Sequence, residues 1–239
     1  MNTEKIYKDH ARYYDLTYAD KDYKIEAGVI HKIIAKYKKS SGKELLDIAC
    51  GSGNHLKHLS KYYSCTGSDI NKGILDVARK KFPSLKFVQA NMIDFKTNKQ
   101  YDIITCLFSS IGYLKTRKSL AMAIKNFSKY LKTGGVLIIE PWFNKKDYKV
   151  GTSYLIVYKS DKIKIARLNI SERKGNVSIM NMHYLIAESG KSVKHLVDKH
   201  EMGLFEINDV TKIMEKNNLE TIYLKKGISG RGTYIGVKK

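Results

Sequence analysis

Two glycines that follow an apolar run are the first residues whose types and spacing could do chemistry. Residues 45–56 read LLDIACGSGNHL, so Gly51 and Gly53 make a Gly-x-Gly turn after an expected strand. A turn of this kind lets a nucleotide approach the backbone closely. Leu56 stands where the dinucleotide-binding fingerprint has its third glycine, and no Gly-Lys-Ser/Thr follows, which excludes a P-loop. The turn predicts a nucleotide-like ligand without deciding which one.

Polar residues at the ends of the next two expected strands narrow the choice of ligand. Asp69 could accept hydrogen bonds from both hydroxyls of a ribose, or it could be an acid that stabilises a helix N-terminus. Asn91 and Met92 suit the edge and the face of an adenine, although a methionine taken alone is more often core. Because Leu56 disfavours a pyrophosphate, we expect an adenosine linked to a thioether or sulfonium.

Composition bounds the class of protein. The chain has 239 residues with 43% hydrophobic content, enough for one domain with an elaboration. No apolar stretch approaches the roughly 18–20 residues that span a bilayer, and the N-terminus lacks the apolar core of a secretory signal. Cys50, Cys65 and Cys106 have no metal or redox spacing and lie in or beside apolar runs, which predicts buried thiols and a cytoplasmic protein. No His/Asp/Glu cluster has ligand spacing, so no metal is expected.

The formal net charge of +21 favours anionic partners. The lysines are nevertheless spread along the chain without a block of five or six, as solvated surfaces would be. A nucleic-acid partner is therefore not expected, although an RNA-binding methyltransferase or a plain RNA-binding protein stays an alternative. Such a protein would show a steep salt dependence of RNA affinity.

Strand-like and helical patterns alternate up to residue 140. The expected strands are 44–49, 64–69, 86–90, 101–107 and 135–140, and the expected helices are 22–38, 53–62, 72–81 capped by Asn71, and 117–131 closed by Gly134-Gly135. Four consecutive strand patterns then cover 152–205, before a helix at 207–217 and strands at 220–225 and 232–238.

This pattern predicts an α/β fold, a doubly wound, Rossmann-like sheet of seven strands with an antiparallel β cap inserted after the fifth strand. The expected domains are 1–142 plus 205–239 for the sheet and 143–204 for a substrate-binding cap. Ligands of open α/β sheets bind beyond the carboxyl ends of the strands. The antiparallel cap would expose sheet edges that could pair two subunits, so a homodimer is a further expectation.

The stretch DIACGSG at 47–53 resembles the first motif of class I S-adenosylmethionine-dependent methyltransferases, and Asp69, Asn91-Met92 and Gly134-Gly135 fit the later motifs in order. This resemblance over residues 44–141 implies S-adenosyl-L-methionine as the cofactor. The residues that it implies for cofactor binding are Tyr14, Ala49, Gly51, Gly53, Asp69, Asn91, Met92 and Leu107.

A closer resemblance covers nearly the whole chain. The segments CLFSSIGYLKT, GGVLIIEPWF, HLVDKHEMGLF and ISGRGTYIGV, in this order, are similar to nucleotide-sugar N,N-dimethyltransferases, which dimethylate the amino group of a dTDP-linked 3-amino-deoxysugar. The resemblance implies a transferase that N-methylates a nucleotide-activated amino-deoxysugar or a similar small molecule. Methylation of another small acceptor is an alternative. Asn91 departs from the Asp usual in this family, but its amide oxygen can still accept a hydrogen bond from adenine N6.

Methyl transfer to an amine needs alignment of the nitrogen lone pair and removal of a proton. Tyr113, beyond the fourth strand, is the first candidate to orient the nitrogen or relay the proton, with a core aromatic as the other interpretation. His195 and His200 lie five apart on one expected strand, so they should face opposite sides, and we favour His200 as catalytic. The other histidines considered, His183, His55 and His58, are taken as structural or surface residues.

Four residues are candidates for substrate binding. Trp142 could stack on a sugar or thymine face, or simply fill the cap interface. Arg231 lies between glycines and offers a planar fork for a diphosphate, unless it is a solvated hairpin arginine, and Ser229 is in the same segment. The resemblance implies that Tyr7 contacts the substrate.

Overall fold

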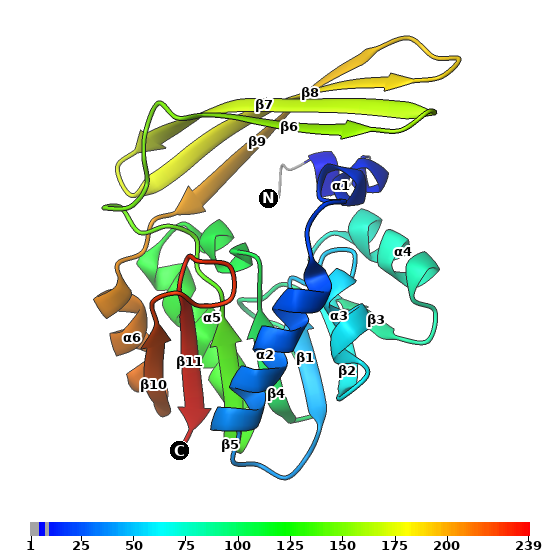
Figure 1. The fold of residues 1–239 in the computed structure, drawn as a ribbon. Coiled ribbons are helices and arrows are strands. Elements are labelled where there is room, and N and C mark those ends of the chain that lie inside the picture. The colour runs from blue at the N-terminus through cyan, green and yellow to red at the C-terminus, as the bar shows by residue number, and fades with distance from the viewer. Residues whose placement is uncertain (1–4, 8–9) are drawn as a thin grey trace.

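The computed structural model of the protein describes residues 5–7 and 10–239. An α/β layer forms its lower part and an antiparallel sheet its upper part, with helix α1 (Ala11–Thr17) beneath the upper sheet (Figure 1). This arrangement confirms the predicted fold class. Within the described ranges, no helix combines the length and the apolar character that crossing a membrane requires.

The central sheet has seven strands in the order β10-β11-β5-β4-β1-β2-β3. Strand β1 pairs in parallel with both β2 and β4, so the order reverses beside β1, and β11 runs antiparallel to β5 and β10. The strands are β1 (Glu44–Ile48), β2 (Ser64–Asp69), β3 (Lys86–Gln89), β4 (Tyr101–Cys106), β5 (Leu131–Ile139), β10 (Leu219–Leu224) and β11 (Thr233–Lys238). The reversal is the switch point at which such sheets bind ligands.

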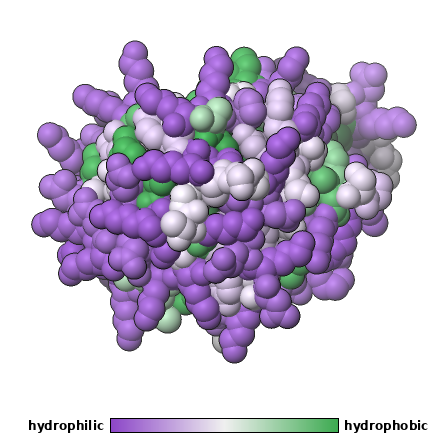
Figure 2. All heavy atoms as spheres, turned by 90° about the horizontal axis from the view of Figure 1, so that it is seen from below, coloured by the Kyte–Doolittle hydropathy of each residue, from purple (hydrophilic) through white to green (hydrophobic). Residues whose placement is uncertain are grey.

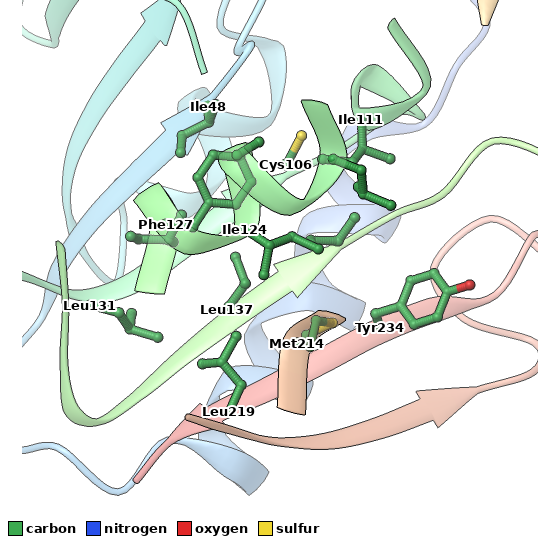
Figure 3. Close-up of a cluster of buried hydrophobic side chains, with 14 of the residues drawn as sticks. Ile48, Cys106, Ile111, Ile124, Phe127, Leu131, Leu137, Met214, Leu219 and Tyr234 are labelled. Carbon is green, nitrogen blue, oxygen red and sulfur yellow. The ribbon is translucent and has the colours of Figure 1, made fainter. Parts of the chain in front are cut away.

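Helices cover both faces of this sheet because its strands alternate buried side chains between two cores. Leu46 and Ile48 pack with one core and Leu45 with the other. The first core receives α5 (Arg117–Tyr130) and α6 (Ile207–Glu215), and Figure 3 shows Ile124 and Phe127 of α5 over Leu137 of β5. The second receives α2 (Tyr23–Tyr37), α3 (Asn54–Leu59) and α4 (Lys72–Lys81).

The upper sheet has the order β6-β7-β8-β9, with every neighbouring pair antiparallel. Its strands are β6 (Ser153–Lys159), β7 (Ile163–Lys174), β8 (Val177–Glu188) and β9 (Lys194–Gly203). We call this sheet the cap. The face of the molecule opposite the cap is mostly hydrophilic (Figure 2).

The predicted role of Gly134-Gly135 is wrong. Helix α5 ends at Tyr130 with an extended Leu131 after it, and strand β5 begins at residue 131 instead of 135. Gly134, at φ +73°, accepts backbone hydrogen bonds from Lys39 and Ser40 through its carbonyl, and a Cβ there would lie 2.9 Å from the Ser40 nitrogen. This glycine therefore permits close approach of the loop after α2 and does not close a helix.

One smaller prediction about the helices also needs correction, and three short helical elements were missed. Asn71 holds the N-cap position of α4, but its side chain makes no capping hydrogen bond there. Three short helical elements, η1 (Lys5–Tyr7), α1 and η2 (Ser110–Leu114), were not predicted at all. Each is too short for its sequence periodicity to be recognised.

Candidate active site

A cavity of about 340 Å³ lies between the carboxyl ends of β4 and β5 and the inner face of the cap. The loops that follow these two strands form its floor, and residues of β7, β8 and β9 form its roof. We call it the central cavity. Of the residues predicted for the site, six line it: Tyr7, Tyr14, Tyr113, Trp142, His200 and Arg231.

A chain of hydrogen bonds runs through one wall of the central cavity. The Tyr7 and Tyr113 hydroxyls lie 3.1 Å apart, and the Tyr113 hydroxyl lies 2.6 Å from Nδ1 of His200. Nε2 of His200 is 2.9 Å from Oδ2 of Asp198, which also accepts the Ile6 backbone N–H at 3.3 Å. Both His200 and Asp198 are buried. The structure thus joins two predicted residues, Tyr113 and His200, to an aspartate that sequence reasoning missed.

The carboxylate gives this chain a direction. A carboxylate only accepts hydrogen bonds, so Nε2 of His200 donates to Asp198, and in the tautomer with its proton on Nε2 the Nδ1 atom accepts from Tyr113. Tyr113 then accepts from Tyr7 or from a ligand. Burial, followed by the neighbouring Tyr113 hydroxyl, raises the pKa of Tyr7 well above its ordinary value, so Tyr7 remains a neutral donor.

The glycine turn after β1 has an unusual backbone. Ala49, Gly51 and Gly53 all have positive φ, at +56°, +56° and +80°. An ideal Cβ on Gly51 would meet no atom within 4 Å, so its Cα faces open space that a ligand could fill. A smaller cavity of about 30 Å³ lies here, lined by Ala49, Gly51 and Leu107 of the predicted set, and Tyr14 and Phe108 line both cavities.

Asp69 organises the other side of this turn. Its Oδ2 accepts the Gly51 N–H at 3.0 Å and its Oδ1 accepts the Asn71 N–H at 2.9 Å. Burial raises the pKa of Asp69, and these backbone donors oppose the shift. Each carboxylate oxygen has a further lone pair, which leaves the side chain able to accept from a ligand hydroxyl.

Asn91 and Met92 follow β3, and neither lines the two cavities. Asn91 accepts the Ile93 backbone N–H through Oδ1 at 3.1 Å, and Met92 packs against the core. The structure places both residues at the same edge of the sheet as Asp69, because β2 and β3 are parallel neighbours.

Glu140, which directly follows β5, contacts several residues on the opposite side of the central cavity. This fully buried carboxylate accepts the Phe108 backbone N–H at 2.6 Å and the Ser229 hydroxyl, and lies 3.7 Å from Nη2 of Arg231. The Arg231 guanidinium is 5.6 Å from the centroid of the Trp142 ring. Ser229 therefore binds Glu140 and does not line the cavity, whereas Arg231 and Trp142 do.

Comparison with known proteins assigns the family. A model described as a methyltransferase domain matches residues 45–135. The chain is 36% identical over 232 residues to the dTDP-3-amino-3,4,6-trideoxy-alpha-D-glucopyranose N,N-dimethyltransferase of Streptomyces venezuelae, a match that covers 96% of this chain and 98% of that one. The chain belongs to the dTDP-amino-sugar N,N-dimethyltransferase family.

Two solved structures support this family assignment. The crystal structure of Streptomyces venezuelae DesVI matches with a TM-score of 0.91 at 35% identity, covering 97% of this chain and 99% of that chain. The sugar N-methyltransferase KedS8 from a Streptoalloteichus species matches with a TM-score of 0.88 at 30% identity, covering 95% and 92%. The protein is an enzyme that depends on S-adenosylmethionine.

The residues of the glycine turn fit this cofactor. The open space over Gly51 admits a ligand close to the backbone, and the buried Asp69 carboxylate can accept ribose hydroxyls. Asp47 lines the smaller cavity, where burial raises its pKa to about 6, although His55 and a 2.7 Å hydrogen bond from Thr105 oppose this shift. A carboxyl group there suits an ammonium group of the cofactor, which would favour its ionised form.

Helix α1 links the glycine turn to the cap beside both cavities. Asp15 of α1 accepts hydrogen bonds from Ser52 and from Nδ2 of Asn54, the latter at 3.0 Å, and pairs with Lys81 of α4. On the other side of α1, Arg12 pairs with Glu188 of the cap at 2.7 Å. The helix therefore connects the glycine turn to the cap while its Tyr14 lines both cavities.

We expect Asp15→Asn to release S-adenosylhomocysteine about 5- to 10-fold faster, because the lost ion pair and weakened hydrogen bonds loosen α1. The dissociation rate is measured by surface plasmon resonance. Asp20→Asn, an exposed acid beyond α1, is the matched control. Equal dissociation rates for both variants and the parent would show that the contacts of Asp15 do not hold α1 over the cofactor.

The structure places the two histidines of β9 on opposite faces, as alternation predicts. His200 is buried at the site, whereas His195 is exposed and its ring stacks on that of His183. His55 pairs with Glu26 at 2.7 Å, a structural role, yet it also lines the smaller cavity. Within the described residues, no group of three His, Cys, Asp or Glu side chains could hold a metal ion.

Proposed function

We propose that this methyltransferase transfers methyl groups to the amino nitrogen of a nucleotide-activated amino-deoxysugar. The observation that carries the proposal is the lining of the central cavity, which combines the Tyr113–His200 pair, suited to an amine, with the Arg231 guanidinium, suited to a diphosphate. Relatives named for dTDP-3-amino and dTDP-4-amino sugars support the same substrate class.

Bound S-adenosylmethionine would supply an electrophilic methyl group. The protein's own task is to present a neutral amine and to take one proton from it for each methyl gained. In this step the amine passes a proton to the Tyr113 oxygen while the Tyr113 hydroxyl proton passes to Nδ1 of His200. Asp198 then stabilises the imidazolium through Nε2, so the proton ends on the His200–Asp198 pair.

The aromatic part of the lining assists this chemistry. Trp142 and Phe108 belong to the aromatic lining, and Tyr14 forms an edge contact with Tyr7 at 5.3 Å between ring centroids. Apolar surroundings disfavour the charged ammonium form of the amine, and alignment of its lone pair is worth at best about 7–11 kcal/mol. Tyr7, as a neutral donor beside Tyr113, helps to orient the nitrogen.

The expected domains fit this proposal, with 1–142 plus 205–239 holding the cofactor and 143–204 roofing the substrate. We also propose a cytoplasmic location, supported by three free cysteines.

A homodimer is proposed through the outer face of the cap, because apolar side chains gather there. Leu155 of β6 pairs across the sheet with Leu168 of β7, and both are about half exposed, as is Ile170. Apolar patches of this kind mark interfaces, and most soluble oligomers pair identical patches by two-fold symmetry. Leu168→Glu should therefore convert a dimer to a monomer in sedimentation velocity; a parent chain that sediments as a monomer at micromolar concentration refutes the proposal.

The first experiment is a methyl-transfer assay with labelled S-adenosylmethionine, read by mass spectrometry. Acceptors are dTDP-3-amino- and dTDP-4-amino-deoxysugars, with bulk tRNA and rRNA alongside. Label on a nucleotide sugar alone supports the proposal and locates the amine. Label on RNA, or on no acceptor despite cofactor binding, overturns the substrate assignment.

A further inference from the structure

Two polar residues of β7 point into the central cavity where the strand pattern leads one to expect apolar ones. Arg167 and Asn169 are 7% and 6% exposed and both line the cavity, whereas Leu168 and Ile170 between and after them are 45% and 58% exposed. The strand is therefore inverted here, with polar side chains inside and apolar ones outside. An inversion that buries a guanidinium needs a compensating gain.

The partners of Arg167 within the protein are neutral. Nη1 donates to the Tyr18 hydroxyl at 2.8 Å, and the guanidinium carbon lies 5.5 Å from the centroid of that ring. Burial raises the pKa of the neighbouring Tyr184, so this phenol is also neutral. No carboxylate of the described residues pairs with Arg167 within 4.0 Å, and none lines the central cavity.

Two donors in this pair lack any partner. Nε of Arg167 and Nδ2 of Asn169 are buried and make no hydrogen bond. Arginine cannot escape the cost by losing its proton, since its pKa is too high. A buried cation beside two unused N–H donors is the arrangement that an anionic ligand with several acceptor oxygens would complete.

We propose that Arg167 and Asn169 form an anion-binding subsite in the cap, which holds a phosphoryl group of the substrate's diphosphate. This inference rests on the proposed function, since it places part of the nucleotide-activated sugar. Arg231 reaches the cavity from the segment between β10 and β11 and is 3.7 Å from Glu140, which partly offsets its charge. Arg167 has no such counter-charge among the described residues, so it contributes the stronger field, and a diphosphate held by both arginines connects the cap to the central sheet.

The test compares ligand affinities by isothermal titration calorimetry for the full chain and its variants. The probes are dTDP, inorganic pyrophosphate and thymidine. Arg167→Gln should weaken dTDP and pyrophosphate about 10- to 100-fold and leave thymidine unchanged, since hydrogen bonds to charged groups are the strong ones. Arg167→Lys should recover part of the loss because it restores the charge without the fork. Asn169→Ala should weaken the same two probes about 3- to 10-fold.

Arg173→Gln is the matched control, because Arg173 lies exposed on the same strand and its loss changes the net charge equally. It should bind every probe like the parent. A thermal melt without ligand adds a readout of folding: Arg167→Gln should melt no lower than Arg173→Gln, since it removes an uncompensated buried charge.

The outcomes separate this inference from the proposed function. If the parent binds dTDP and Arg167→Gln binds it equally well, the subsite is refuted while the substrate class stands. If Arg167→Gln weakens the binding of thymidine as much as that of dTDP, Arg167 contacts the nucleoside and the inference is also refuted. If the parent binds pyrophosphate through Arg167 but methylates no nucleotide sugar, the proposed function fails and the anion site remains.

Discussion

Replacing His200 by glutamine should lower kcat for the amino sugar about 10²- to 10⁴-fold at neutral pH, the range typical of a lost proton acceptor. Among the described residues of the hydrogen-bond chain, the His200 imidazole can accept the Tyr113 proton, whereas Tyr7 remains protonated. KM should change less than threefold, since the buried His200 side chain is proposed to act on the substrate through its hydrogen bond with Tyr113. Steady-state kinetics by mass spectrometry measure both constants.

The neighbouring His195→Gln is the control, because this exposed histidine lies on the same strand and faces away from the site. The pH profile supplies a second readout. The activity of His200→Gln should rise with pH more steeply than that of the parent, as solvent hydroxide replaces the missing acceptor. A variant with parental kcat and the parental pH profile would leave alignment alone as the source of catalysis.

Asp198 extends the same argument to a residue that acts through another. An asparagine there can donate through its amide to Nε2, which would favour the wrong tautomer and occupy Nδ1 with a proton. Asp198→Asn should therefore reproduce the pH effect of His200→Gln in weaker form. Its backbone hydrogen bond from Ile6 also ties η1, which carries Tyr7, to the cap.

The strong periodicity of apolar residues along the sequence made most of the fold predictable. The strand ends that carry Asp69 and the residues after β4 and β5 were located because each buried strand is a short apolar run between turn signals. Inward and outward positions on β9 followed from alternation, which put His200 and His195 on opposite faces. Local pattern thus identifies the edge of the sheet where ligands bind.

Residues whose roles depend on distant partners escaped this reasoning. Asp198 acquires its role from His200, and Asp15 from Ser52, Asn54 and Lys81, contacts that no local spacing encodes. The Gly134-Gly135 pair was misread for the same reason, since its carbonyl contacts Lys39 and Ser40 far earlier in the chain. Glycine after a helical pattern signals a C-cap locally, and tertiary contact overrode it here.

The inverted stretch of β7 shows where pattern reasoning fails for a physical reason. Alternation correctly predicts a strand, but the usual assumption that apolar residues face inward would place Leu168 and Ile170 in the cavity. The structure buries Arg167 and Asn169 instead. Such violations are expected at sites where a ligand supplies the missing partners.

Replacing Asp69 should have the largest effect on cofactor affinity. Asp69→Ala removes the carboxylate that we propose accepts two ribose hydroxyls, and also the partner of the Gly51 and Asn71 N–H groups, which shape the turn. Two hydrogen bonds to a charged acceptor are worth about 3–6 kcal/mol together, so the Kd of S-adenosylhomocysteine should rise at least about 100-fold. Isothermal titration calorimetry measures this change.

Asp69→Asn distinguishes a loss of ligand contacts from a loss of turn structure. Its one remaining oxygen can still accept a backbone N–H, whereas its amide group can no longer accept from a second hydroxyl. We expect its folding to match that of Asp76→Asn, a partly exposed acid on α4 that serves as the control, in circular dichroism and thermal melting. Its Kd should nevertheless rise about 10- to 100-fold. An asparagine variant that binds S-adenosylhomocysteine as tightly as Asp76→Asn would show that Asp69 supports the turn and makes no ribose contact, and the cofactor would then depend on the open face of Gly51 and on Asp47.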